Sequence, residues 1–316
     1  MSESIGIAHF SGTGNTRLVS GLLAEALRDR GAEVEELAIE DVLNLRGHWD
    51  TTGYRRIGIG WPVHAFDAPR IVYEFLHRLP PGEGKPVFTF RSAGDPFWNG
   101  GPTEPTRRAL AQRGYRVFRE DLFVMPPNVL IACPNTVARQ LYLKAEQRVE
   151  AIASAILADA DAERDAITNS PLFRRVVARI FAKSESLGAR LAGRWWHVTA
   201  DCTLCNRCVD ECPPGNIFRD LNRLTFGWDC LLCMRCVYLC PEQAIKPPLW
   251  LSFMVLKEGY DPASVLDDAN DSADDQVPIP SSFGYRDRLL RYLNEPDFSL
   301  TDTVGGSLVD KGERDP

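Results

Sequence analysis

The chain has 316 residues, of which 44% are hydrophobic and 25% charged, a composition that predicts an ordinary globular protein with about two domains. The formal net charge of −7 and the pI near 5.4 argue against nucleic acid as the main partner. No basic segment precedes the apolar residues 5–10, and no apolar run reaches the roughly 18 residues of a spanning helix. We therefore expect no secretory signal, no transmembrane segment and a cytoplasmic location.

Residues 1–157 alternate between short apolar runs typical of strands and longer stretches with helical apolar spacing. The helical stretches are residues 18–27 and 137–157. Strands separated by helices of this length imply a parallel sheet covered on both faces, so we predict a doubly wound α/β domain over 1–157. The strand candidates are residues 5–10, 34–39, 55–61, 85–90 and 115–125.

Residues 158–196 combine a polar linker with a basic amphipathic helix. Such a helix can lie on an anionic membrane. The alternative, which we favour because a segment between two domains must be packed somewhere, is a helix that docks the domains with its basic side in solvent or facing an acidic partner. The expected apolar positions are Leu172, Phe173, Val176, Val177, Ile180, Phe181, Leu187 and Leu191. The basic positions are Arg174, Arg175, Arg179, Lys183, Arg190 and Arg194, against Glu185 alone.

Residues 197–248 contain eight of the nine cysteines, in the runs CTLCNRCVDECP (202–213) and CLLCMRCVYLCP (230–241). Each run has the spacing C-x2-C-x2-C-x3-C-P, which is that of bacterial ferredoxins with two [4Fe–4S] clusters. Three cysteines of a run bind one cluster and the fourth serves the other. The first cluster then takes Cys202, Cys205, Cys208 and Cys240. The second takes Cys230, Cys233, Cys236 and Cys212.

A pair of structural zinc sites is the alternative for these eight cysteines, but zinc does not require this repeated spacing with a proline after each run. The ninth cysteine, Cys133, stands apart in the sequence. We expect it to be a small buried hydrophobe, with a regulatory thiol as the other possibility. Residues 249–316 form an extension that we expect to be partly loose. It includes the acidic residues 267–275 and one short helix over 283–295.

A glycine loop, FSGTGNT, follows the first strand and opens the first helix. It lacks the lysine of a Walker loop and is not a G-x-G-x-x-G dinucleotide motif. Backbone amides at the helix N-terminus, with hydroxyl and amide side chains, provide neutral donors for a monophosphate. The candidate phosphate ligands are Ser11, Gly12, Thr13, Gly14, Asn15 and Thr16.

This loop resembles the FMN-phosphate loop of flavodoxins, in which two further loops, after the third and fourth strands, hold the isoalloxazine ring. The corresponding residues here are 60–66 and 91–98. Ligands of open α/β sheets bind at the carboxyl ends of the strands, in agreement with this placement. The candidate ring contacts are Trp61, Pro62, Val63, His64, Ala65 and Phe66, together with Ser92, Ala93, Gly94, Asp95, Phe97 and Trp98.

The resemblance assigns different roles to these residues. The aromatic side chains would flank the flavin, and backbone amides near Ala65 and Gly94 would contact the ring edge and tune its potential. His64 could supply a proton to the reduced flavin, although a single loop histidine is more often only solvated. The loop over 60–70 lacks the glycine-rich pattern of many short-chain flavodoxins.

As a whole, residues 4–248 resemble the flavodoxin–ferredoxin fusion proteins: a flavodoxin-like α/β domain followed by a small α+β two-cluster ferredoxin domain. The resemblance implies an iron–sulfur flavoprotein that transfers electrons between its clusters, FMN and a redox partner protein. The alternative is a stand-alone flavin-dependent reductase of a small molecule such as a quinone. A cluster-bearing regulator is disfavoured because nothing resembles a nucleic-acid module, and no NAD(P)H fingerprint is present.

Overall fold

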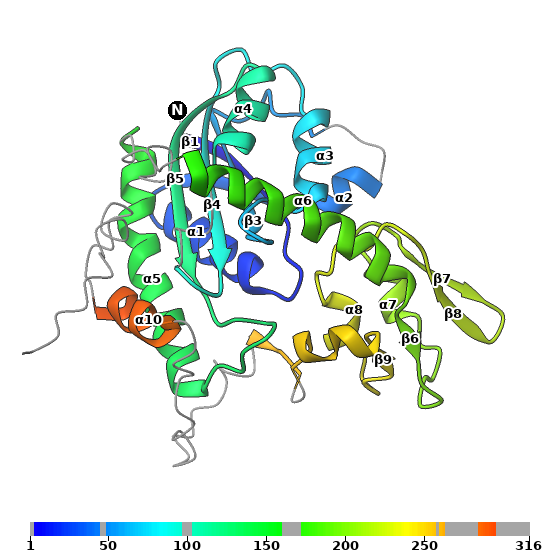
Figure 1. Ribbon diagram of the computed structural model, residues 1–316. Coiled ribbons are helices and arrows are strands. Elements are labelled where there is room, and N and C mark those ends of the chain that lie inside the picture. Colours follow the sequence, from blue (N-terminus) through cyan, green and yellow to red (C-terminus); the bar gives the residue numbers. More distant parts are fainter. Residues whose placement is uncertain are drawn as a thin grey trace, which may run out of the picture.

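Five parallel strands form a sheet in the N-terminal half of the chain, in the order β2-β1-β3-β4-β5 (Figure 1). This is the flavodoxin-like doubly wound order, which confirms the predicted fold class. The strands are β1 (Glu3–His9), β2 (Ala32–Ala38), β3 (Arg56–Pro62), β4 (Pro86–Ala93) and β5 (Arg116–Val124). The computed structural model describes residues 3–44, 49–96, 103–159, 172–256, 259–262 and 284–294, with only the backbone of residues 172–175.

Helices cover both faces of the sheet. On one face α1 (Asn15–Arg28) packs against α5 (Asn135–Leu157), and their apolar residues share a core with β1. The other face carries three shorter helices, which the sequence patterns did not indicate because they are only two to three turns long. These are α2 (Ile39–Asn44), α3 (Arg70–Arg78) and α4 (Glu104–Gln112).

Strand β3 divides its side chains between the two faces of the sheet. A Cβ atom on Gly58 or Gly60 would lie only 2.3 or 2.2 Å from the ring of Phe88 or Phe90, so these glycines make room for the aromatic side chains of β4. The alternate positions, including Trp61, then face the core beneath α3. Trp61 is 1% exposed. The expectation that it flanks a flavin is therefore wrong: strand alternation turns it into the core.

Helix α6 (Leu172–Arg194) crosses from the sheet domain to the cysteine-rich unit (Figure 1). In that unit β6 (His197–Val198) pairs with β9 (Ile245–Lys246), so both ends of the unit meet in one small sheet. Each cysteine run contains one helical turn, α7 (Arg207–Asp210) or α8 (Arg235–Tyr238). Between the runs lies a hairpin of β7 (Ile217–Asp220) and β8 (Arg223–Phe226). A separate apolar core supports the unit: Trp196, Cys208, Ile217, Phe226, Met234, Val237 and Ile245.

The C-terminal extension returns to the sheet domain. After the 3-10 turn η3 (Leu249–Met254), helix α10 (Tyr285–Asn294) lies beside α5 (Figure 1). Leu289 and Tyr292 of α10 pack against residues of β5 and α5. The Val124 N–H donates to the Tyr292 hydroxyl at 3.3 Å. The predicted helix in this region is confirmed, and it is part of the domain core. The acidic residues 267–275 and the tail 295–316 lie outside the described residues.

Candidate iron–sulfur centres and phosphate loop

The two cysteine runs fold with the same unusual backbone. Leu204 and Asn206 in the first run have φ of 55° and 67°, and the equivalent Leu232 and Met234 in the second have 49° and 61°. Left-handed conformations are unfavourable for such residues, at roughly 1–3 kcal/mol each. Because these conformations recur at matched positions, both runs curl in the same way. Loops that wrap around a ligand curl in this manner.

The cysteine thiols form two neighbouring groups. Burial raises the pKa of Cys208 to about 11, and the further contributions come from Cys240, Cys202 and Cys205. In the other group, burial raises the pKa of Cys230 to about 12, with Cys233 and Cys212 next to it. Burial raises the pKa of Cys236 strongly as well, with further contributions from Cys233, Cys230 and Cys212 and from Cys208 of the first group. Buried thiols in such numbers need positive charge to ionise, and iron would provide it. Ligation of the two clusters by these groups stays a prediction.

Backbone amides point at the sulfur atoms in equivalent ways. The Asn216 N–H donates to Cys212 Sγ at 3.2 Å, and the Ala244 N–H donates to Cys240 Sγ at 3.3 Å, four residues after the cysteine in both cases. Such hydrogen bonds tune cluster potentials. Within the described chain, no three His, Cys, Asp or Glu side chains are arranged to hold one metal ion. A cubane differs from a single ion in that each thiolate binds a different iron.

The glycine loop connects β1 to α1 and is fixed by its own hydrogen bonds. The Gly14 N–H donates to the Ser11 hydroxyl at 3.2 Å, and Gly14 has φ of 110°, which only glycine adopts readily. The hydroxyls of Thr16 and Ser92 are hydrogen bonded at 2.7 Å, which ties the loop to the end of β4. The side chain of Asn15 is used otherwise than expected: its amide donates to the Pro126 carbonyl at 2.9 Å.

The donor set of this loop fits a phosphate. The Asn128 amide donates to Thr13 Oγ1 at 2.7 Å, which leaves the Thr13 hydroxyl hydrogen for an anion. The loop also lies in a positive field at the N-terminus of α1. Two residues before it, His9 has a pKa lowered to about 4, by burial first and then by the cations Arg17 and Arg235. These features match FMN, whose phosphate the resemblance places here.

The second cysteine run packs directly against the glycine loop. A Cβ atom on Gly12 would lie 2.5 Å from the Cys233 carbonyl oxygen, so the two backbones touch. The Arg235 guanidinium donates to the carbonyl oxygens of Ser11, at 2.6 Å, and Gly12, at 3.3 Å, and it also pairs with the Glu40 carboxylate. The candidate cluster and the candidate phosphate loop are therefore immediate neighbours.

The loop after β3 makes a tight turn under the cysteine unit. His64 and Asp67 exchange two backbone hydrogen bonds of 2.9 Å, and Ala65 and Phe66 between them have φ of 43° and 70°. This is the conformation of a type I′ turn, and two non-glycine residues in it are strained. Burial lowers the pKa of His64 to about 4, opposed by a hydrogen bond with the backbone of Leu231. His64 is partly buried, with its side chain 17% exposed, and is more enclosed by the cysteine run than the expected solvated loop histidine.

The loop after β4 contacts two segments that the sequence did not connect with it. Gly94 lies against Pro127, where an added Cβ atom would come within 2.9 Å. The Asp95 carboxylate accepts two hydrogen bonds from Arg288 of α10, the longer at 3.0 Å. Phe97 and Trp98, the other expected ring contacts, lie outside the described residues. The C-terminal extension thus supports a candidate flavin loop.

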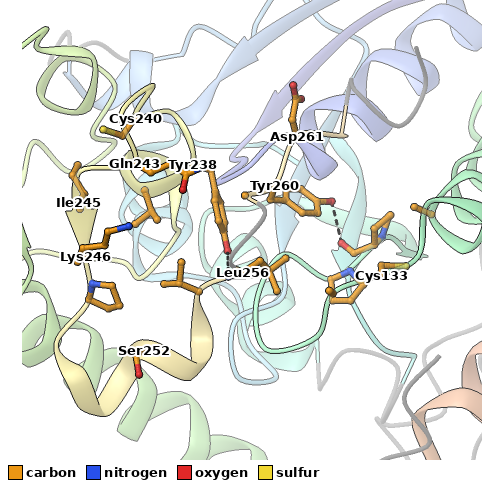
Figure 2. Close-up of a pocket in the computed structure, with 18 of the residues that line it drawn as sticks. Cys133, Tyr238, Cys240, Gln243, Ile245, Lys246, Ser252, Leu256, Tyr260 and Asp261 are labelled. Carbon is orange, nitrogen blue, oxygen red and sulfur yellow. Dashed lines mark hydrogen bonds between the residues drawn. The ribbon is translucent and has the colours of Figure 1, made fainter. Parts of the chain in front are cut away.

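A cavity of about 650 Å³ lies between the sheet domain, the cysteine unit and residues 252–256 and 259–261 (Figure 2). Cys240 of the first cysteine group lies at one side and Cys133 at the other. Burial raises the pKa of the Cys133 thiol to about 12. Tyr260 donates to Asn15 at 2.6 Å and also lies 3.1 Å from the Pro126 carbonyl oxygen, whereas the buried Tyr142 hydroxyl makes no hydrogen bond of standard geometry.

A comparison with known protein families matches the cysteine-rich unit. Residues 194–241 match the family model described as a 4Fe–4S dicluster domain. A search of functionally curated proteins found no match. The described helices include none with the length and apolarity needed to cross a bilayer.

Similar solved structures cover the N-terminal half. One is a short-chain flavodoxin associated with a non-canonical PDU bacterial microcompartment, with 16% identity and a TM-score of 0.37 over 51% of this chain and 100% of that chain. Another is two-electron reduced flavodoxin from Megasphaera elsdenii, with 25% identity and a TM-score of 0.33 over 48% and 99%. General stress protein 14 from Treponema denticola, in complex with FMN, has 12% identity and a TM-score of 0.37 over 48% and 99%.

The chain thus joins a flavodoxin-like domain, defined by its strand order, to a 4Fe–4S dicluster domain, which supports an electron-transfer role. Sequence patterns missed several residues that hold the site together. Arg235 could have been noted from its place between two cysteines. Glu40, Tyr260 and Arg288 carried no signal, because their partners are far away in the sequence.

Proposed function

We propose that this chain is an electron-transfer protein that holds two [4Fe–4S] clusters and one FMN and exchanges electrons with a redox partner protein. A [4Fe–4S] cluster carries one electron at a time and FMN accepts one or two, so the pair connects single-electron carriers to a two-electron acceptor. The observation that carries the proposal is the direct contact of Cys233 with Gly12.

The residues of the chain have distinct parts in this proposal. Residues 11–16 would hold the FMN phosphate, and the loops 62–67 and 92–95 would lie toward the ring. Arg235 fixes the cysteine run on the phosphate loop through Ser11, Gly12 and Glu40. Leu231 is buried in the same core as Phe10 and Trp61, and this packing keeps water out of the contact. The cluster ligands would be Cys202, Cys205, Cys208 and Cys240 for one cluster and Cys230, Cys233, Cys236 and Cys212 for the other.

The net charge of the chain indicates which kind of partner surface it would attract. The chain has a formal net charge of −7, so a partner with a basic docking face would be attracted at long range. Complementary charge raises the rate of encounter more than the affinity, as suits a protein that must release its partner after each transfer. We therefore expect association that weakens as salt is added.

Anaerobic reduction tests the proposal. In the reconstituted protein, dithionite should bleach the absorption of both chromophores. A Cys208→Ala variant should keep FMN and lose one cluster, and cluster-mediated flavin reduction with it. Cys133→Ala, which removes a thiol outside both groups, is the control and should behave as the parent. Equal flavin reduction in Cys208→Ala and the parent would contradict the proposal.

A second candidate function is reduction of a small molecule such as a quinone. The observation that favours it is the cavity in Figure 2, which Cys240 lines together with Tyr238 and Tyr260. The Tyr142 hydroxyl also lines this cavity, beside the Tyr260 hydroxyl, where it can meet a carbonyl oxygen. The test is steady-state reduction of a quinone panel, with dithionite as the electron donor. Turnover that falls in Tyr142→Phe would support it, and no turnover above that of free dithionite would exclude it.

A further inference from the structure

Helix α6 packs in the opposite sense to the one expected from its sequence. The helix does dock the two units, but through its small residues: Ala178, Ala189 and Ala192 are buried. At its end, Gly193 lies against Cys230, where an added Cβ atom would come within 2.2 Å. The exposed residues are the large apolar ones instead: Val176, Ile180, Phe181, Leu187 and Leu191. The side chains of Leu172 and Phe173 lie outside the described residues. Because α6 packs through alanine and glycine, its face with large apolar side chains is left exposed to solvent.

The open face has two parallel strips. The apolar strip is Val176, Ile180, Leu187 and Leu191, of which Ile180 and Leu187 are each 61% exposed. The basic strip is Arg179, Lys183, Arg190 and Arg194, all exposed. Each basic residue follows an apolar one by three positions, so the strips run side by side along the helix.

Tryptophan extends this face at the end of the helix. Trp195 is 66% exposed and directly follows the basic strip. Trp228, also exposed, is adjacent in the chain to Asp229, which pairs with Arg190 at 3.1 Å. Phe181 is exposed as well, with its ring 6.2 Å from that of Phe66. Exposed large apolar side chains that gather along one helix face indicate an interaction surface.

The charge of the face indicates what covers it. Glu185 is the only acidic residue of the helix, and it lies toward His64, with 3.8 Å between Oε1 and Nδ1. Within the described residues Arg190 pairs with Asp229 and Arg179 with Glu104, so Lys183 and Arg194 are the basic side chains that face a partner, and a second copy would bring the same excess of positive charge. Aliphatic and aromatic side chains beside Lys and Arg, with Trp at one end, are typical of helices that lie in the interface of an anionic bilayer.

We propose that the outer face of α6, with Trp195, binds the surface of an anionic membrane. The apolar strip enters the boundary between headgroups and acyl chains, and the basic strip contacts the phosphates. This places the second cysteine group, which the inner face of α6 covers at Cys230, beside the membrane. The proposal does not depend on the electron-transfer function.

Vesicle binding tests the proposal on the full-length protein. It should sediment with phosphatidylglycerol-containing vesicles far more than with phosphatidylcholine alone, and salt should weaken the binding. The double variant Ile180→Ser/Leu187→Ser should bind at least about tenfold more weakly, because two apolar side chains no longer insert. Lys183→Gln/Arg194→Gln should lose roughly tenfold or more at low salt.

Leu143→Ser is the matched control, since Leu143 is 49% exposed on α5 and should not affect binding. All these positions are exposed, so the variants should fold, and unchanged iron content would verify this. Equal binding to both vesicle types would overturn the proposal. So would a dimer, measured by light scattering, that Ile180→Ser/Leu187→Ser abolishes, because a second copy would then cover the face.

Discussion

Arg235, between two cysteines of the second run, pairs with Glu40 at the start of α2 and donates to two carbonyl groups of the glycine loop. The two residues are 195 positions apart in the chain, and their side chains are 14% and 9% exposed. This pair fixes the cysteine-rich unit on the carboxyl edge of the sheet, where doubly wound folds bind their ligands.

Loss of one partner of this pair should destabilise the protein. Arg235→Gln leaves the Glu40 carboxylate buried without its cation, so we expect a loss of about 3 kcal/mol in the free energy of unfolding. Denaturant unfolding under anaerobic conditions measures it. The double variant Glu40→Gln/Arg235→Gln should recover part of the loss.

Arg207→Gln is the control for this prediction. Arg207 has the equivalent position in the first run but is exposed, so its substitution should change stability by less than about 0.5 kcal/mol. Equal effects of Arg207→Gln and Arg235→Gln would show that the contact with the glycine loop does not stabilise the protein.

Gly12→Ala should separate the two units. The new methyl group would lie 2.5 Å from the Cys233 carbonyl oxygen and 3.1 Å from its Cβ atom. Because backbone cannot yield as a flexible side chain does, we expect a loss of about 1–3 kcal/mol and weaker FMN binding. Thermal unfolding and flavin titration check both effects.

Gly21→Ala serves as the comparison, since Gly21 lies in α1 and an added Cβ atom would meet nothing within 4 Å. It should stabilise the helix by about 0.5–1 kcal/mol. The prediction is contradicted if Gly12→Ala is tolerated as well as Gly21→Ala.

His9 should make the protein less stable in mild acid. Its pKa is lowered to about 4 by burial and then by Arg17 and Arg235, whereas the unfolded chain takes up the proton near the ordinary value of 6.5. Between these values the unfolded state binds more protons, so stability is full above pH 6.5 and falls as the pH drops toward 4. The whole contribution is about 3 kcal/mol.

Thermal unfolding at pH 5 and pH 7.5 tests this prediction through variants. His9→Gln should lose less stability than the parent between the two pH values. His197→Gln, at an exposed position, should follow the parent. A parent and His9→Gln with the same acid sensitivity would show that His9 is not the group responsible.

Cys133 should be unreactive in the folded protein. Burial raises the pKa of its thiol to about 12, so at pH 8 only about one molecule in ten thousand carries the thiolate. Anaerobic alkylation with iodoacetamide, followed by mass spectrometry of the peptide 126–144, measures the labelling. Rapid labelling before denaturation would indicate the regulatory thiol that we disfavour.

The parts of this structure that sequence patterns predicted are those set by local spacing. The cysteine runs and the order of strands and long helices along the chain belong to this class, because apolar periodicity and ligand spacing depend only on residues close together in the sequence. The short helices α3 and α4 were not predicted, because nine residues show too little apolar periodicity.

The remaining features depend on contacts between distant segments. The side of α6 that packs inward is decided by which of its faces allows close approach to Cys230, and amphipathic spacing alone gave the wrong face. Trp61 was expected beside a ligand because it ends a strand, yet alternation along β3 turns it into the core. The support of Asp95 by Arg288 of α10 joins residues 193 positions apart and had no local signal.

Quantification of iron, acid-labile sulfide and flavin in one anaerobic sample tests the central claim most directly. The account predicts two [4Fe–4S] clusters, and thus about eight irons and eight sulfides, with one FMN per chain. Zinc in the cysteine-rich unit in place of iron, or clusters without any flavin after incubation with FMN, would contradict it.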